Sequence, residues 1–149
     1  MITKSINILN LNVPCYCHCR YCLLEWNGKT LGIDYDRSVR YAKSFYKWLK
    51  ENRSDLKFTY YFGYSMEHPK LLEAIKFMQE TNSPGGEFLQ FDGMKERTNE
   101  ELVNFLTEIK SSGIKLIDLT FYGLEHYHDK FAGRYGDYKL MMNTLEIAL

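Results

Sequence analysis

All four cysteines of the chain lie in one short segment, "VPCYCHCRYC", which spans residues 13–22. Three of them, Cys15, Cys19 and Cys22, fit the spacing C-x3-C-x2-C. Three thiolates on one loop can hold a cubic [4Fe–4S] cluster and leave one of its irons without a protein ligand. An open coordination position is useful in catalysis because a substrate or cosubstrate can bind the metal directly. The segment therefore indicates iron–sulfur chemistry.

Disulfides and zinc are the competing uses of these thiols. The N-terminal stretch "MITKSINILNLNV" is too short and too polar for a secretory signal or a membrane span. The cytoplasm is therefore the expected compartment, and thiols stay reduced there. Structural zinc sites usually combine two separated Cys or His pairs. This sequence offers no second pair, since His18 lies inside the same segment, and the pattern favours a cluster over zinc. A non-catalytic zinc- or Fe–S-binding interaction module is kept as the alternative.

The composition is that of one globular domain. The chain has 149 residues, 45% of them hydrophobic, which is enough for a sizeable core. Lysine plus arginine number 19, and so do aspartate plus glutamate, which gives a net charge of zero. Without a basic excess or a long apolar run, neither a nucleic acid nor a membrane is expected as a partner.

Four strand-then-helix units follow one another along the chain. The strands show β-branched and aromatic residues, and the helices show apolar residues at helical spacing. A capping box of Thr98 and Glu101 opens the third helix, and Gly113 closes it. The second helix is expected to start near Pro69, a residue suited to the first helical position, and Asp137 is expected to cap the last helix. The expected strands are residues 5–13, 56–62, 87–91 and 114–122, and residues 123–136 are expected to form a loop.

Alternating strands and helices predict an α/β fold with parallel (β/α) repeats. A closed eight-unit barrel takes roughly 250 residues, so about four units predict an open, partial TIM-type barrel. The chain stops inside an amphipathic helical pattern, "NTLEIAL". We therefore expect residues 1–149 to be the N-terminal portion of a longer catalytic barrel.

The cysteine spacing directly after the first strand, with an aromatic residue before the last cysteine, resembles the radical S-adenosylmethionine (radical SAM) superfamily. The resemblance implies that Cys15, Cys19 and Cys22 hold the [4Fe–4S] cluster. It also implies that the cluster binds S-adenosylmethionine and cleaves it reductively, and that the resulting 5′-deoxyadenosyl radical abstracts hydrogen from a substrate. Tyr21 matches the aromatic residue that packs near the adenine. Cys17 lies outside the pattern and is interpreted as a bystander.

Weaker matches follow the later strands. The family's Gly-Gly-Glu-Pro motif corresponds to "YFGYSMEHPKLL" in two alternative registers, of which one uses Gly63 and the other uses Glu67. Glu67 can equally be a carboxylate favoured at a helix N-terminus. Asp92 stands where the family often has Thr-Asn-Gly, although Asp-Gly is also an ordinary turn. Thr120 stands at the family's serine position after the fourth strand, although threonine is also a common strand residue.

The segment "HDKFAGRYGDY", residues 128–138, resembles a His-Asp…Gly…Gly segment of radical SAM peptide-modifying and activating enzymes. By analogy it suggests a peptide or protein substrate. His126 and His128 are not expected to form a metal pair. Instead, His128 and Asp129 should hydrogen-bond the loop that leads into the last helix. The family further implies a low-potential electron donor such as flavodoxin or ferredoxin. Because part of the barrel is absent, this chain alone can be incomplete and inactive.

Overall fold

The computed structural model describes residues 4–11, 15–22, 34–63 and 66–149. Parallel strands alternate with helices along most of the chain, so the fold is mixed α/β. The elements in chain order are β1 (Ser5–Leu11), α2 (Tyr35–Asn52), β2 (Lys57–Gly63), α3 (Leu71–Glu80), η1 (Pro84–Gly86), β3 (Phe88–Gln90), α4 (Asn99–Ser111), β4 (Leu116–Asp118), α5 (Glu125–Ala132) and α6 (Asp137–Ala148).

The strands pair in twos. β1 lies parallel to β2 with Ser5 opposite Lys57, and β3 lies parallel to β4 with Phe88 opposite Leu116. Within the described residues these are two separate two-stranded sheets. The expected alternation of parallel strands and helices is therefore present, while a barrel wall that joins all four strands stays a prediction. β3 and β4 are shorter than expected, because the chain leaves the ladder after Gln90 and Asp118.

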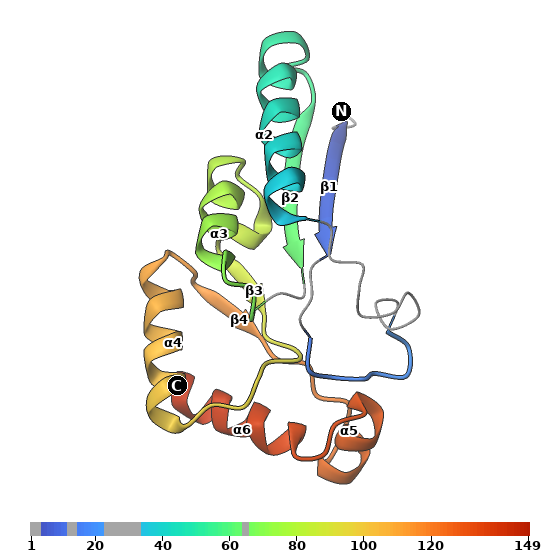
Figure 1. Cartoon of the computed structure of the whole chain (residues 1–149), viewed down its shortest axis with the longest axis vertical. Helices are drawn as coiled ribbons and strands as arrows, with labels where there is room; N and C mark the ends of the chain where they lie inside the picture. The colour runs from blue at the N-terminus through green and yellow to red at the C-terminus, as the bar shows by residue number, and fades with distance from the viewer. Residues whose placement is uncertain (1–3, 12–14, 23–33, 64–65) are drawn as a thin grey trace.

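The core lies between β2 and the helices next to it. Phe58, Tyr60 and Phe62 alternate along β2 and are almost fully buried, as the two-residue period of a strand requires. They pack in one cluster with apolar residues of α3, including Ile75 and Met78. Figure 1 shows α2 and α3 beside this strand. Burial of this face fixes β2 firmly and so fixes where its carboxyl end lies.

Two expected helix boundaries are confirmed. Thr98 and Glu101 form the capping box at the start of α4. Gly113 follows the end of α4 with a φ of +98°, a conformation that glycine adopts without strain. The second helix begins near Pro69 as expected, at Leu71, but the first helical position expected for Pro69 is wrong in detail, because Lys70 is the N-cap and Pro69 lies in the preceding turn.

The expected loop at residues 123–136 is also wrong in part, since it contains the helix α5. His128 and Ala132 lie one helical turn apart and are both buried. Gly133 ends the helix in the left-handed region, which is a common helix stop. A stretch of eight residues with few aliphatic side chains hid this helix from a pattern search. No helix in the described part of the chain is long and apolar enough to cross a membrane.

Candidate functional site

The cysteine segment, residues 15–22, lies at the end of the molecule toward which β1 and β2 point, next to α5 (Figure 1). The backbone N–H of Tyr16 donates to the carbonyl of Gly93, after β3, at 2.9 Å. The N–H of His18 donates to the carbonyl of Ala132, at the end of α5, at 2.8 Å. The segment is therefore fixed to two loops that are distant from it in sequence. Parallel β/α proteins place their chemistry at this carboxyl end of the strands.

Two glycines let the cysteine segment approach this closely. A Cβ on Gly93 would collide with the sulfur of Cys15, and a Cβ on Gly133 would collide with the carbonyl oxygen of His18. Both glycines also have a φ of +65°, which other residues adopt only at a cost. The surface that receives the cysteine segment therefore depends on the absence of side chains at these two positions.

All four thiols are free and partly buried. The thiol of Cys17 lies within hydrogen-bond reach of Cys15 and Cys19, and this contact lowers the pKa of Cys15 to about 7 and also lowers the pKa of Cys19. The same contacts raise the pKa of Cys17 well above its ordinary value. The residue interpreted as a bystander therefore lies between two of the expected ligands.

The donor set fits the expected cluster in its chemistry. Three free thiols at the C-x3-C-x2-C spacing share one anchored segment, and each would bind a different iron of a cubic cluster. Residues 4–11, 15–22, 34–63 and 66–149 contain no group of three or more His, Cys, Asp or Glu side chains gathered closely enough to hold a metal ion. The ligand assignment of Cys15, Cys19 and Cys22 stays a prediction.

The structure brings Asp92 and Thr120 together, because β3 and β4 are parallel neighbours and each residue follows its strand. The carboxylate of Asp92 accepts from the backbone N–H of Thr120 at 3.2 Å and from its hydroxyl at 3.1 Å. Burial raises the pKa of Asp92, and the two bonds from Thr120 oppose that rise. The same offset of 28 residues that pairs Gln90 with Asp118 continues two residues past the strands.

Tyr21 faces α5. Its ring lies 5.4 Å from that of Phe131 and 5.9 Å from that of Tyr122, and the two tyrosine hydroxyls are hydrogen-bonded. Tyr21 remains about half exposed, at 56%. The last part of the cysteine segment is therefore held by aromatic contacts with α5 and the loop before it, while half of the Tyr21 surface stays accessible.

Gly63 and Glu67, the two alternatives for the Gly-Gly-Glu-Pro motif, have different surroundings. Gly63 ends β2 and pairs with Leu11. The carboxylate of Glu67 accepts two bonds from the guanidinium of Arg97, each at 2.7 Å, and a third from the backbone N–H of Lys95 at 3.0 Å. Both side chains of the ion pair are almost fully buried. Glu67 therefore ties its own loop to the loop after β3, and a cosubstrate contact for Gly63 or Glu67 stays a prediction.

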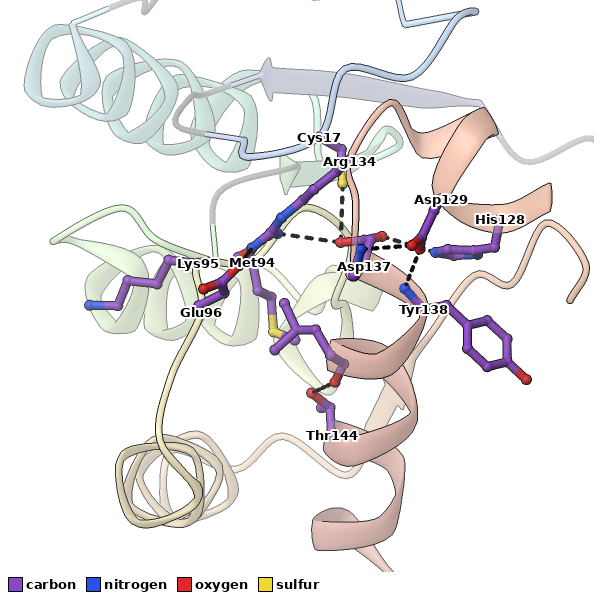
Figure 2. A network of polar contacts seen from close by, with 12 residues as sticks. Cys17, Met94, Lys95, Glu96, His128, Asp129, Arg134, Asp137, Tyr138 and Thr144 are labelled. Carbon is purple, nitrogen blue, oxygen red and sulfur yellow. Dashed lines mark hydrogen bonds and ion pairs between the residues drawn. The ribbon is translucent and has the colours of Figure 1, made fainter. Parts of the chain in front are cut away.

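The segment from His128 to Tyr138 carries a second polar network (Figure 2). Asp129 accepts from the backbone N–H groups of Gly136 at 2.7 Å and Tyr138 at 2.9 Å, so the expected capping of the last helix is confirmed. Asp137 is the first residue of α6 but does not cap it. Instead, its carboxylate is buried and faces His128, Arg134 and Cys17.

The hydrogen bonds of His128 define its tautomer. The backbone N–H of Tyr122 donates to Nδ1 at 3.2 Å, so Nδ1 is the acceptor. Nε2 therefore carries the proton and donates to Asp137 at 2.9 Å. Nδ1 therefore ties α5 to the loop before it, and Nε2 ties α5 to α6.

Arg134 and Asp137 are functional candidates that the sequence pattern missed. Arg134 donates to the carbonyl of Met94 and to Asp137, and lies 3.7 Å from Glu96. Its guanidinium also lies 6.0 Å from the ring of Tyr16. The sequence offered one signal for them: Arg134 lies between Gly133 and Gly136, and Asp137 follows Gly136 directly. Charged residues next to glycines are by themselves typical of an exposed turn.

In comparisons with protein-family models, with curated proteins and with solved structures, no match to this chain is found.

Proposed function

We propose that this chain is the N-terminal part of the catalytic core of a radical SAM enzyme. One observation carries the proposal: the C-x3-C-x2-C segment follows the first parallel strand in the sequence and is fixed to the loop after β3 and to the end of α5. A partly exposed loop at the carboxyl ends of parallel strands is where such folds bind cofactors. Free, partly buried thiols in that position favour a metal cofactor over a structural role in the core.

Cys15, Cys19 and Cys22 would hold a [4Fe–4S] cluster through one thiolate each. When bound, such a cluster supplies one electron to S-adenosylmethionine, whose cleavage yields methionine and a 5′-deoxyadenosyl radical that abstracts hydrogen from the substrate. The chain itself supplies the fixed loop. Its backbone bonds to Gly93 and Ala132 hold the cysteine segment next to the loop after β3 and the end of α5, without any contribution from the cofactor.

The Asp92–Thr120 pair would bind the polar part of S-adenosylmethionine. Each carboxylate oxygen of Asp92 accepts one bond from Thr120 and keeps a lone pair for a further donor. A partly buried carboxylate that is already oriented by two bonds can accept a hydroxyl or ammonium group with little reorganisation. Tyr21 would pack against the adenine with its exposed half, and Gly63 would allow close approach of the backbone.

The remaining parts of the proposal rest on the resemblance. The segment at residues 128–138 suggests a peptide or protein substrate, and the electron would come from a donor such as flavodoxin or ferredoxin. Free thiols fit the reducing cytoplasm, where we place the protein. The partial TIM-type barrel would be completed by β/α units beyond these four.

Anaerobic reconstitution with iron and sulfide tests the proposal. We expect about four irons and four sulfides per chain, and an absorbance and electron paramagnetic resonance spectrum that changes when S-adenosylmethionine is added. Single replacement of Cys15, Cys19 or Cys22 by Ala should abolish cluster loading. Thr120→Val removes one bond to Asp92 at constant shape and should weaken S-adenosylmethionine binding about fivefold to tenfold.

The alternative module gives a different result in the same experiment. A chain that binds one zinc, or a cluster whose spectrum ignores S-adenosylmethionine, would be a metal-binding interaction module rather than an enzyme. His126→Ala is the matched control for nonspecific damage, because His126 is exposed on α5 and is not among the proposed ligands. This variant should load iron and respond to S-adenosylmethionine like the unmodified chain.

A further inference from the structure

Three consecutive residues in the middle of the cysteine segment are anchored to three different places. Tyr16 donates to the carbonyl of Gly93 and His18 donates to the carbonyl of Ala132, both through the backbone. Between them, the thiol of Cys17 donates to Oδ1 of Asp137 at 3.6 Å (Figure 2). Any residue except proline at positions 16 and 18 could donate the two backbone bonds. The bond at position 17 requires a side chain that donates a hydrogen bond.

Asp137 is a firmly held anchor. The residue is only 3% exposed, and a buried carboxylate is stable only with good partners. Oδ2 accepts from Nε2 of His128 at 2.9 Å, and Oδ1 accepts from the guanidinium of Arg134 at 3.3 Å. Arg134 in turn reaches the carbonyl of Met94. The network therefore joins α5, α6 and the loop after β3 at the point where Cys17 reaches it.

We infer that Cys17 and Asp137 are positioning residues that hold the cysteine segment in place between Cys15 and Cys19. The inference rests on the proposed function in one respect, since it takes these two flanking cysteines as cluster ligands. The sulfur of Cys17 points toward Oδ1 of Asp137 (Figure 2), while the residues on either side of it are held through their backbone. Cys17 therefore serves the segment as a hydrogen-bond donor.

The first test uses the full chain before any iron is added. Cys17→Ala should increase hydrogen exchange at the backbone amides of Tyr16 and His18 about fivefold to tenfold, the size expected for one lost hydrogen bond of ordinary strength. Cys17→Ser keeps a donor and should restore near-original protection. The amide of Leu102 in α4, bonded to Thr98 at 2.9 Å, is the reference for global opening. Unchanged exchange at Tyr16 and His18 in Cys17→Ala would overturn the inference.

The second test follows iron loss from the reconstituted protein to a chelator. The Cys17→Ala and Asp137→Asn variants should each start with about four irons per chain and lose them about fivefold to tenfold faster, and Cys17→Ser should lose them at close to the original rate. Loss of all iron binding in both Cys17→Ala and Cys17→Ser would mean that Cys17 is a ligand, against the inference. Variants that unfold at a lower denaturant concentration but release iron at the original rate would show that Cys17 and Asp137 contribute only to general stability, also against the inference. If the unmodified chain binds no cluster, the proposed function fails, and the exchange test still decides the anchoring.

Discussion

Two buried carboxylates, Glu67 and Asp137, are each paired with an arginine but are used differently. The three bonds that Glu67 accepts come from Arg97 and Lys95 in the loop after β3, so its cluster is closed within two loops. Asp137 divides its oxygens among His128, Arg134 and Cys17, so its cluster extends to the cysteine segment. The first cluster joins two loops to each other, while the second also joins the framework to the candidate site.

This difference teaches that burial and ion pairing alone do not mark a functional residue. Both arginines also lie near an aromatic ring: Arg97 lies 4.1 Å from the centroid of Phe105 and Arg134 lies 6.0 Å from that of Tyr16. The two clusters differ in the element to which the aromatic ring beside the arginine belongs. Phe105 belongs to α4, whereas Tyr16 belongs to the cysteine segment. We therefore expect variants of the two clusters to separate stability from positioning.

The largest effect on stability is expected from Arg97→Ala. This change leaves Glu67 buried without its countercharge and should lower the free energy of unfolding by about 3–5 kcal/mol. Urea denaturation followed by circular dichroism measures it. The matched control is Arg53→Ala, because Arg53 pairs with Asp55 on the exposed surface and should matter little. A small effect at Arg97 would mean that water replaces the guanidinium and that the Glu67 cluster is not closed.

Gly93→Ala should have the next largest effect. Any residue at this φ costs about 1–2 kcal/mol of conformational strain, and the new Cβ would also collide with the sulfur of Cys15. Gly136→Ala is the matched control, since Gly136 has a φ of +79° but open space around its Cβ position. Denaturant unfolding should show a loss at Gly93 that exceeds the loss at Gly136 by about 1–3 kcal/mol. Equal losses would show that the cysteine segment does not pack against Gly93.

Asp137→Asn is expected to be milder than Arg97→Ala. Asn loses the charge, and its NH2 group would face the N–H at Nε2 of His128, so the bonds to Arg134 and Cys17 are weakened; this should cost about 1–2 kcal/mol in the free energy of unfolding. Hydrogen exchange should separate the two clusters more clearly than stability does. The amides of Tyr16 and His18 should exchange faster in Asp137→Asn and be little changed in Arg97→Ala. The reverse pattern would assign the positioning role to the Glu67 cluster.

The smallest effect concerns Asp92, a partly buried carboxylate. Burial raises its pKa in the folded state above the ordinary value of 3.8. The folded protein therefore binds a proton more readily than the unfolded chain, so stability from this group increases as the pH falls through the window just above 3.8. Asp92→Asn removes this dependence. Between pH 7 and pH 4 the unmodified protein should gain stability relative to the variant in thermal unfolding, and a constant difference would show that Asp92 does not titrate there.

Much of the framework could be predicted from the sequence because it depends on local patterns. The two-residue alternation of Phe58, Tyr60 and Phe62 and the capping box of Thr98 and Glu101 need no distant partner to be recognised. Asp92 and Thr120 could be placed together because each follows its strand at a parallel position. The helix α5 was missed because its burial comes from His128 and Ala132, which do not form an aliphatic stripe.

The sequence by itself determined which atoms are available for chemistry: three thiols at the C-x3-C-x2-C spacing, a fourth between two of them, and the strand-then-helix order that carries them to a carboxyl end. Only the tertiary structure decided how that segment is held. The bonds to Gly93, Ala132 and Asp137 join residues far apart in the chain, and no local pattern encodes such contacts. Their physical reason is burial, since a carboxylate such as Asp137 that has left water must find donors from whichever segments fold next to it.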